Sequence, residues 1–450
     1  MVGSSQLLDE LSRLVKRSPA DGTSICAQGQ GRHVMRFAYG TIHQVLFQEH
    51  LTVTIKAVLG KRVGVASTDT FERASLNRTL AAALALARHA PNQPSLSPLP
   101  AAHQLLTTED RDDATAQAGP EAVLPAIKRV FQLCQGAGAS LAGSCALGED
   151  ELAVVNSSGV ACYAASTLTG AKLVTMYRKL SGFASLVERR LSRLNFDDLL
   201  ETSLAQCLHR QAPVTLPLGT YEVILEPEAV AELLMWLGSI AFGAKSFHEK
   251  TSCVAGRLGE QVMDRRITIL DDGTRPEGLR MLFDFEGVPK RRVPLIERGT
   301  AAGLVYDSTY GHLYGQTSTG HGLPPDDVEG PQPLHLFLEP GSVPREELIR
   351  RCKRGILIPR FHYVNGLLNP PEALMTGLTR EGAWLIEDGK RKAPITTLRF
   401  THSLVDALRH VVAISKERRR VADPMQESGC AVVPTLHLAR LRFTGRSEDA

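Results

Sequence analysis

A surplus of one charge sign, a long apolar run and paired cysteines would each place a chain in a special class, and these 450 residues have little or none of each. The 51 lysines and arginines nearly balance 48 aspartates and glutamates, so net charge gives no argument for a nucleic-acid or membrane partner. No apolar run reaches the roughly 18 residues that a membrane helix needs. The eight cysteines occur singly, without a C-x-x-C pair, which is typical of neither a zinc knuckle nor a disulfide framework.

The location and class of the chain follow from these absences. Residues 1–17 carry acids among apolar positions and lack the basic, apolar, small-residue order of a secretory signal. Together with the unpaired cysteines, this predicts a protein of the cytoplasm without a membrane contact. A hydrophobic content of 43% with 22% charged residues is typical of globular chains, and the length predicts more than one domain.

The N-terminal half alternates helical and strand patterns. Helical spacing is present at residues 6–16, 72–90, 120–135 and 183–210, and strand alternation at 34–65 and 151–177. Pro213 and Pro217 interrupt the last helical pattern. We therefore predict an α+β protein whose N-terminal α/β domain, residues 1–215, has a mixed sheet with flanking helices.

The C-terminal half is richer in strand patterns. An apolar helix is predicted at residues 227–244, with shorter helices at 344–354 and 402–418, and strands pair around glycine-containing turns elsewhere. The basic run at residues 416–420 is expected at a helix end, where cations complement exposed carbonyls. We predict a β-rich domain over residues 216–450 with a central helix.

One pattern suggests metal chemistry within this half. His248 and Glu249 precede Cys253, as in helical zinc-protease motifs. Five residues place Cys253 about 140° around a helix from His248, which is poor geometry for a shared ion. A surface His-Glu pair is therefore favoured, and catalysis by His248 and Glu249 is kept as an alternative.

Motifs for other chemistries are missing. There is no G-x-S-x-G nucleophile elbow, and Cys145 and Cys430 lack a neighbouring cation in sequence that would activate a thiol. The glycine-rich segments 311–315 and 319–322 match neither a dinucleotide fingerprint nor a P-loop. Their glycines would permit a close backbone approach, by a tight turn or by an extended peptide ligand.

A series of segments in fixed order closely resembles the TldD/PmbA family. They are 221–229 (YEVILEPEA), 255–260 (AGRLGE), 271–274 (DDGT), 283–289 (FDFEGVP), 304–307 (LVYD), 318–321 (STGH), 376–382 (TGLTREG), 384–389 (WLIEDG) and 398–400 (LRF). Segments 62–67 and 155–159 extend a weaker match into the N-terminal half.

The resemblance implies dimers in which a peptide-cleaving zinc site faces an internal cavity. The family's catalytic branch carries H-E-x-x-x-H on the helix before A-G-x-L-G-E, with a cysteine near the C-terminus. In this sequence the corresponding place falls at residues 235–240 (MWLGSI), which offer only a weak thioether. The chain is thus similar to the PmbA branch, also called TldE, whose members pair with a zinc-bearing TldD partner. We expect no metal or other cofactor in this chain, and zinc in a TldD-like partner.

Three functional hypotheses follow from the resemblance. The favoured one is a metal-free subunit of a peptidase complex, paired with a TldD-like homologue or with itself, that binds unfolded peptide by strand addition. Another is a stand-alone peptidase or amide hydrolase that uses His248, Glu249, His321 or Cys430. The third is a peptide-binding scaffold, including a modulator of a nucleic-acid enzyme. The expected ligand-binding residues are Ser318, Thr319, His321, Thr379 and Arg380.

Overall fold

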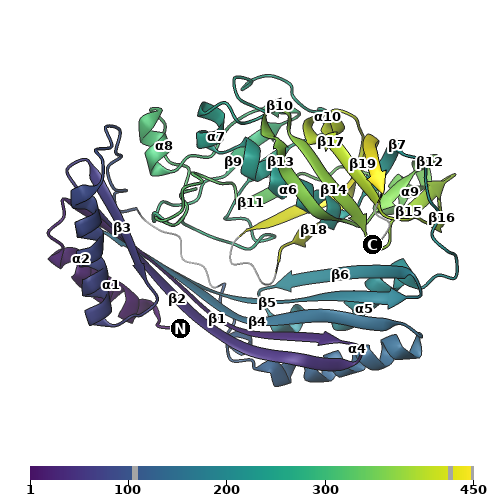
Figure 1. The fold of residues 1–450 in the computed structure, drawn as a ribbon, viewed down its shortest axis with the longest axis horizontal. Helices are drawn as coiled ribbons and strands as arrows, with labels where there is room; N and C mark the ends of the chain where they lie inside the picture. Colours follow the sequence, from purple (N-terminus) through teal and green to yellow (C-terminus); the bar gives the residue numbers. More distant parts are fainter. Residues whose placement is uncertain (104–109, 424–428, 447–450) are drawn as a thin grey trace.

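The N-terminal half is built around one strongly curved sheet, as the computed structural model shows (Figure 1). The structure describes residues 1–103, 110–423 and 429–446. Six long strands pair in the order β3-β2-β1-β4-β5-β6, and every neighbouring pair is antiparallel. Their bounds are β1 Gly22–Ala38, β2 Thr41–Leu59, β3 Arg62–Thr68, β4 Ser140–Asn156, β5 Ala161–Tyr177 and β6 Leu180–Glu188.

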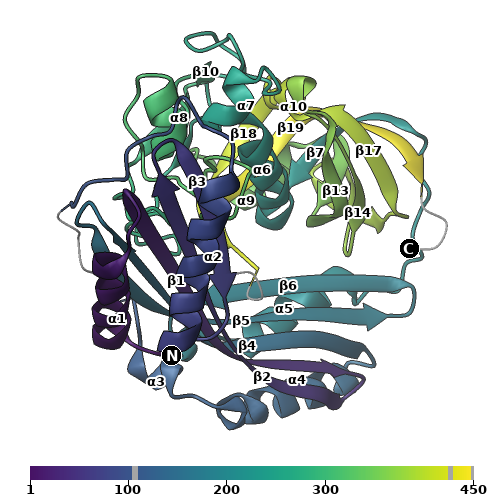
Figure 2. The same cartoon turned by 60° about the vertical axis from the view of Figure 1, so that its left-hand side comes forward.

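Helices cover only one face of this sheet. Apolar residues of α1 and α2 pack on β1 and β2, and those of α4 and α5 pack on β4 and β5. The bounds are α1 Ser4–Arg17, α2 Arg73–His89, α3 Asp113–Ala116, α4 Leu124–Gly136 and α5 Phe196–Cys207. The other, concave face is turned toward the C-terminal half (Figures 1 and 2).

The C-terminal half wraps a second sheet around helix α6, Pro227–Ala241. Its main path runs β10-β9-β8-β11-β19-β7-β12-β15-β16, and β17, β14 and β13 branch from β19, which also pairs with β18. The strands are β7 Gly219–Leu225, β8 Ile269–Asp271, β9 Val293–Glu297, β10 Thr300–Ala301, β11 His335–Leu338, β12 Arg354–Ile358, β13 Arg360–Asn369, β14 Leu374–Arg380, β15 Trp384–Glu387, β16 Lys390–Pro394, β17 Leu398–Ser403, β18 Val411–Val421 and β19 Cys430–Arg446.

Short helices complete this half. They are α7 Ala244–His248, α8 Ser308–Leu313, α9 Arg345–Arg351 and α10 Leu404–Leu408. Among the described residues, none of the helices has the length and apolar character needed to cross a membrane. The eight cysteines are all free and buried.

The α+β class and the β-rich C-terminal half with its central helix are as predicted, and three details differ. The N-terminal sheet is antiparallel throughout instead of mixed. The helix predicted over residues 183–210 starts only at Phe196, because residues 180–188 form β6 and pair with β5. Of the helix predicted over residues 402–418, only the short helix α10 is present, and strand β18 follows it. The predicted domain boundary at residue 215 falls between α5 and β7.

Candidate functional site

Helix α6 occupies the centre of the C-terminal half and has one open side. Pro227 suits its first turn, where no intrahelical partner is needed for the backbone nitrogen. Nine of its residues are buried against the strands around it: Ala229, Val230, Ala231, Leu233, Leu234, Leu237, Gly238, Ile240 and Ala241. The remaining stripe, at helical spacing, consists of Glu228, Glu232, Met235, Trp236 and Ser239. The apolar helix predicted at residues 227–244 is therefore buried on its core-facing side only.

Two carboxylates of this stripe lie in a poorly solvated place. Burial raises the pKa of Glu228, and the charge of Arg419, whose Nη1 lies 2.9 Å from Glu228 Oε1, partly opposes this. Burial likewise raises the pKa of Glu232, opposed by a hydrogen bond from Trp236. A raised pKa favours the protonated form of a carboxyl group, which can donate a hydrogen bond or a proton.

Basic residues of β18 join the two halves of the molecule. Arg419 donates to the carbonyl of Ser185 in β6 as well as pairing with Glu228. Arg420 Nη2 lies 2.7 Å from both Glu188 Oε2 and the carbonyl oxygen of Val187. The prediction that residues 416–420 end a helix is wrong. They lie in strand β18, and its consecutive residues Arg419 and Arg420 both contact β6 at the edge of the N-terminal sheet.

A cavity of about 480 Å³ lies between the concave face of the N-terminal sheet and the C-terminal half. Strands β1, β2, β4 and β5 contribute polar side chains on one side, among them Gln28, His50 and Asp150. Loops of the C-terminal half contribute residues 279–282 and 323–324, and β11 contributes His335. The cavity is large enough for several residues of an extended peptide.

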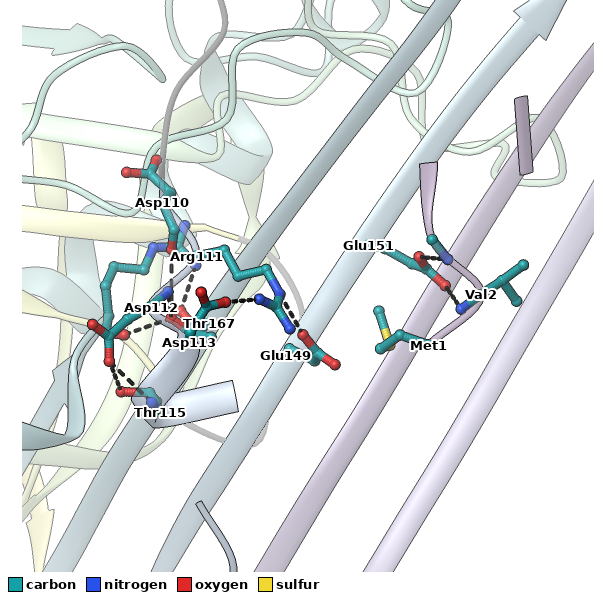
Figure 3. Close-up of polar contacts among 12 residues, drawn as sticks. Met1, Val2, Asp110, Arg111, Asp112, Asp113, Thr115, Glu149, Glu151 and Thr167 are labelled. Atoms are coloured by element: carbon teal, nitrogen blue, oxygen red, sulfur yellow. Dashed lines mark hydrogen bonds and ion pairs between the residues drawn. The ribbon is translucent and has the colours of Figure 1, made fainter. Parts of the chain in front are cut away.

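A smaller pocket of about 150 Å³ adjoins this cavity and is rich in arginine. Asp110, Arg189 and Arg280 line both spaces. The arginines of the pocket are held by carboxylates and carbonyl groups: Arg111 Nε donates to Glu149 over 2.8 Å and also pairs with Asp113, as Figure 3 shows. Figure 3 also shows Glu151, which accepts the backbone N–H groups of Val2 and Gly3 at 2.8 and 3.0 Å.

A buried acid–base group stands behind the cavity wall. His321 Nε2 lies 2.7 Å from Asp271 Oδ1, and the backbone N–H of His335 donates to Asp271 Oδ2 over 2.7 Å. Burial and the positive charge of Lys290 lower the pKa of His321, and they lower that of His335 to about 3. Both imidazoles are therefore neutral at pH 7, and His321 acts as a donor to the Asp271 carboxylate.

The predicted ligand residues fall into two groups on different segments. Thr319 and His321 are brought together, with Oγ1 of the threonine 2.9 Å from Nδ1 of the histidine, and Ser318 donates to the carbonyl of Tyr306. Thr379 is buried and accepts the N–H of Leu398, whereas Arg380 is partly exposed and pairs with Glu381. None of the five lines either cavity described above. Their role in ligand binding stays a prediction.

His248 and Glu249, the alternative catalytic pair, line neither of these two cavities. His248 ends the short helix α7 and stacks on Tyr314 with ring centroids 3.3 Å apart. Burial lowers its pKa, and its buried Nε2 has no hydrogen-bond partner within the described residues. Glu249 is exposed. The amino-acid sequence does not reveal the pocket that Arg189, Arg280 and Arg420 line, because no local pattern shows that three distant segments meet there.

Comparison with known proteins identifies relatives of this chain. A TldD homologue from Haemophilus influenzae, named as a metalloprotease, is 27% identical over 216 residues, which are 47% of this chain and 44% of that protein. A metalloprotease from Methanothermobacter thermautotrophicus is 22% identical over 45% of this chain and 44% of its own length. The chain thus aligns with less than half the length of these curated relatives.

The fold has a solved counterpart, and the C-terminal half has a family model. The structure of TldE from Thermococcus kodakarensis superposes with a TM-score of 0.88 at 21% identity, over 97% of this chain and all of that one. Residues 218–445 match the model of the PmbA/TldA metallopeptidase C-terminal domain. Because that match spans half of the sequence and contains α6 with all the strands around it, the chain belongs to the PmbA/TldD family.

Proposed function

We propose that this protein is the subunit of a TldD/TldE-type metallopeptidase complex that lacks the catalytic zinc, and that it processes unfolded peptides together with a zinc-bearing TldD-like partner in the cytoplasm. The observation that carries the proposal is the composition of α6. Between Pro227 and Ala241 the helix has no histidine and no cysteine, so it offers no imidazole or thiolate to a zinc ion.

The strand β2 supports the binding of an extended peptide. Strand β3 pairs only with residues 53–59 of β2, so within the described chain no strand pairs with the outer side of residues 41–52. His50 and Thr52 of this free edge line the large cavity. A free edge offers backbone N–H and C=O groups to a peptide in strand conformation, whatever its side chains.

Mixing experiments test the proposal. The purified chain and a zinc-bearing TldD homologue from the same source are assayed on an unstructured fluorogenic peptide, separately and together. We expect hydrolysis only by the mixture, and its loss when the homologue's H-E-x-x-x-H histidines are replaced. Hydrolysis by this chain alone that His248→Ala or Glu249→Gln abolishes would support the stand-alone hydrolase instead.

A further inference from the structure

Three side chains with metal-binding atoms converge at a place that lines neither cavity and includes no residue of α6. Glu222 comes from β7, Cys352 from the residue that ends α9, and His437 from β19. Their ligand atoms all lie within 4.8 Å of one another, and in the described part of the chain no other group of three such residues meets this condition. The separation in sequence, 130 residues and 85 residues, hides the group from any motif search.

The three residues are held in place by their elements. Strand β7 lies between β19 and β12, and Glu222 stands opposite Gly355 in the register. The N–H of Cys352 donates to Ile349 at the end of α9, and its carbonyl accepts the N–H of Gly389. A Cβ at Gly355 would lie 2.6 Å from the Cys352 sulfur, so a glycine is needed for the thiol to approach β7 this closely. The site is thus preformed by backbone contacts.

The surroundings leave the histidine incompletely satisfied by the protein. Cys352 is fully buried and His437 is 1% exposed. His437 Nε2 makes a short contact with Glu222 Oε1, while its buried Nδ1 has no hydrogen-bond partner among the described residues. Buried polar atoms in folded proteins are nearly always paired, and an exception often marks an ion or a water. Burial and the charge of Glu222 raise the pKa of the Cys352 thiol to about 12.

The donor set suits one particular cation. A thiolate, an imidazole and a carboxylate are all ligands of Zn²⁺, whereas Mg²⁺ and Ca²⁺ require oxygen ligands. Two negative ligands and a divalent cation sum to zero charge, which reduces the cost of placing the ion in a buried site. The side chain of Glu222 is 29% exposed, so water can reach a fourth coordination position.

We propose that Glu222, Cys352 and His437 bind one Zn²⁺ ion that joins β7, β19 and the α9–β12 connection. The ion has no part in peptide hydrolysis; it fixes the end of the second sheet at which Trp384 and α9 pack. The proposal replaces the expectation that the isolated chain binds no zinc. It does not depend on the absence of histidine and cysteine from α6, on which the proposed function rests, so the two proposals fail or succeed separately.

The test uses the full-length protein, stripped with a chelator and titrated with Zn²⁺ alone. We expect one equivalent to bind, with affinity falling at least about 100-fold in Cys352→Ser and His437→Gln. Zn²⁺ should also raise the midpoint of thermal unfolding of the wild type and not that of the variants. Cys253→Ser removes another buried thiol, outside the site, and serves as the control, with unchanged binding expected.

Substitution of Co²⁺ gives an independent spectroscopic readout, for which the wild type supplies the main signal. A thiolate-to-Co²⁺ charge-transfer band in the wild type should be lost in Cys352→Ser, and it should weaken in Glu222→Gln, which changes a partly exposed side chain without changing its shape. Failure of the wild type to bind Zn²⁺ would overturn the proposal. Zinc affinity that is the same as in the wild type in both single variants, Glu222→Gln and His437→Gln, would also overturn it. Loss of zinc binding in His248→Ala would overturn it too.

Discussion

At the scale of single residues, His335 gives the protein a defined sensitivity to acid. Burial lowers its pKa to about 3, whereas the unfolded chain binds the proton near the ordinary value of about 6.5. Between these values the unfolded state holds more protons, so the free energy of unfolding falls as the pH falls, by up to about 1.4 kcal/mol per pH unit. Above pH 6.5 the full contribution is present.

Denaturant unfolding of the wild type and His335→Gln at intervals from pH 7 to pH 4 measures this contribution. We expect the free energy of unfolding to decrease more steeply with falling pH for the wild type than for the variant. The difference in slope should reach up to about 1.4 kcal/mol per pH unit, which corresponds to one proton. His43→Gln changes an exposed histidine and should keep the wild-type slope. Parallel curves for the wild type and His335→Gln would show that another group controls the acid response.

The buried group around His321 shows how far a sequence can predict a site. The glycine-rich segment at 319–322 drew attention to Thr319 and His321, and the structure does place these two in contact. Their carboxylate partner Asp271 lies 50 residues away, and nothing in the local pattern connects it to them. Side chains that are neighbours in sequence can be found by pattern. Those that only the fold brings together, such as Glu222 and His437, cannot.

At the scale of elements, β18 controls the attachment of the C-terminal half to the N-terminal sheet. Arg420 is largely buried, pairs with Glu188 and donates to the carbonyl of Val187. Arg420→Met keeps the aliphatic part of the side chain, removes the guanidinium, and leaves Glu188 partly buried without this partner. We expect it to lower the free energy of unfolding by roughly 2–3 kcal/mol, because an unpaired buried charge keeps its desolvation cost.

Arg440→Met, at a pair that is far more exposed, should cost less than about 1 kcal/mol. Equal losses in the two variants, measured by urea unfolding, would contradict this role for β18.

The strand β18 is also the element that the sequence predicts least well. Leu404, Val405, Leu408 and Val411 have helical spacing, and only the first three are in a helix. From Val411 onward the chain pairs with β19, and this pairing outweighs the weak local preference. By contrast, the helix at residues 72–90 and the helix from Pro227 have strong local signals at their ends and were predicted within a few residues. Local signals therefore define the helices, and the sheet is defined by contacts that the sequence does not show.

At the scale of the whole molecule, the open stripe of α6 predicts association with a second chain. Met235 is 38% exposed in the single chain, and Trp236 lies beside it against Gly366 of β13. Large apolar side chains on an otherwise buried helix are covered in most proteins, and no described segment of this chain covers Met235. We expect a dimer, with itself or with a zinc-bearing TldD homologue, in which the partner packs on this stripe.

Sedimentation measurements on single variants decide whether the stripe is an interface. Trp236→Ala should weaken association or stability by a few kcal/mol, the usual scale for truncation of a buried aromatic side chain. Met235→Lys separates the two effects: because Met235 is exposed in the single chain, the fold should tolerate a lysine, whereas a dry interface should not, so association should weaken at least tenfold without loss of thermal stability. Leu86→Lys changes a residue of α2 that is 54% exposed and should leave association unchanged. A stable wild-type monomer, unaltered by added homologue, would exclude this interface, and it would remove the complex on which the proposed peptidase function depends.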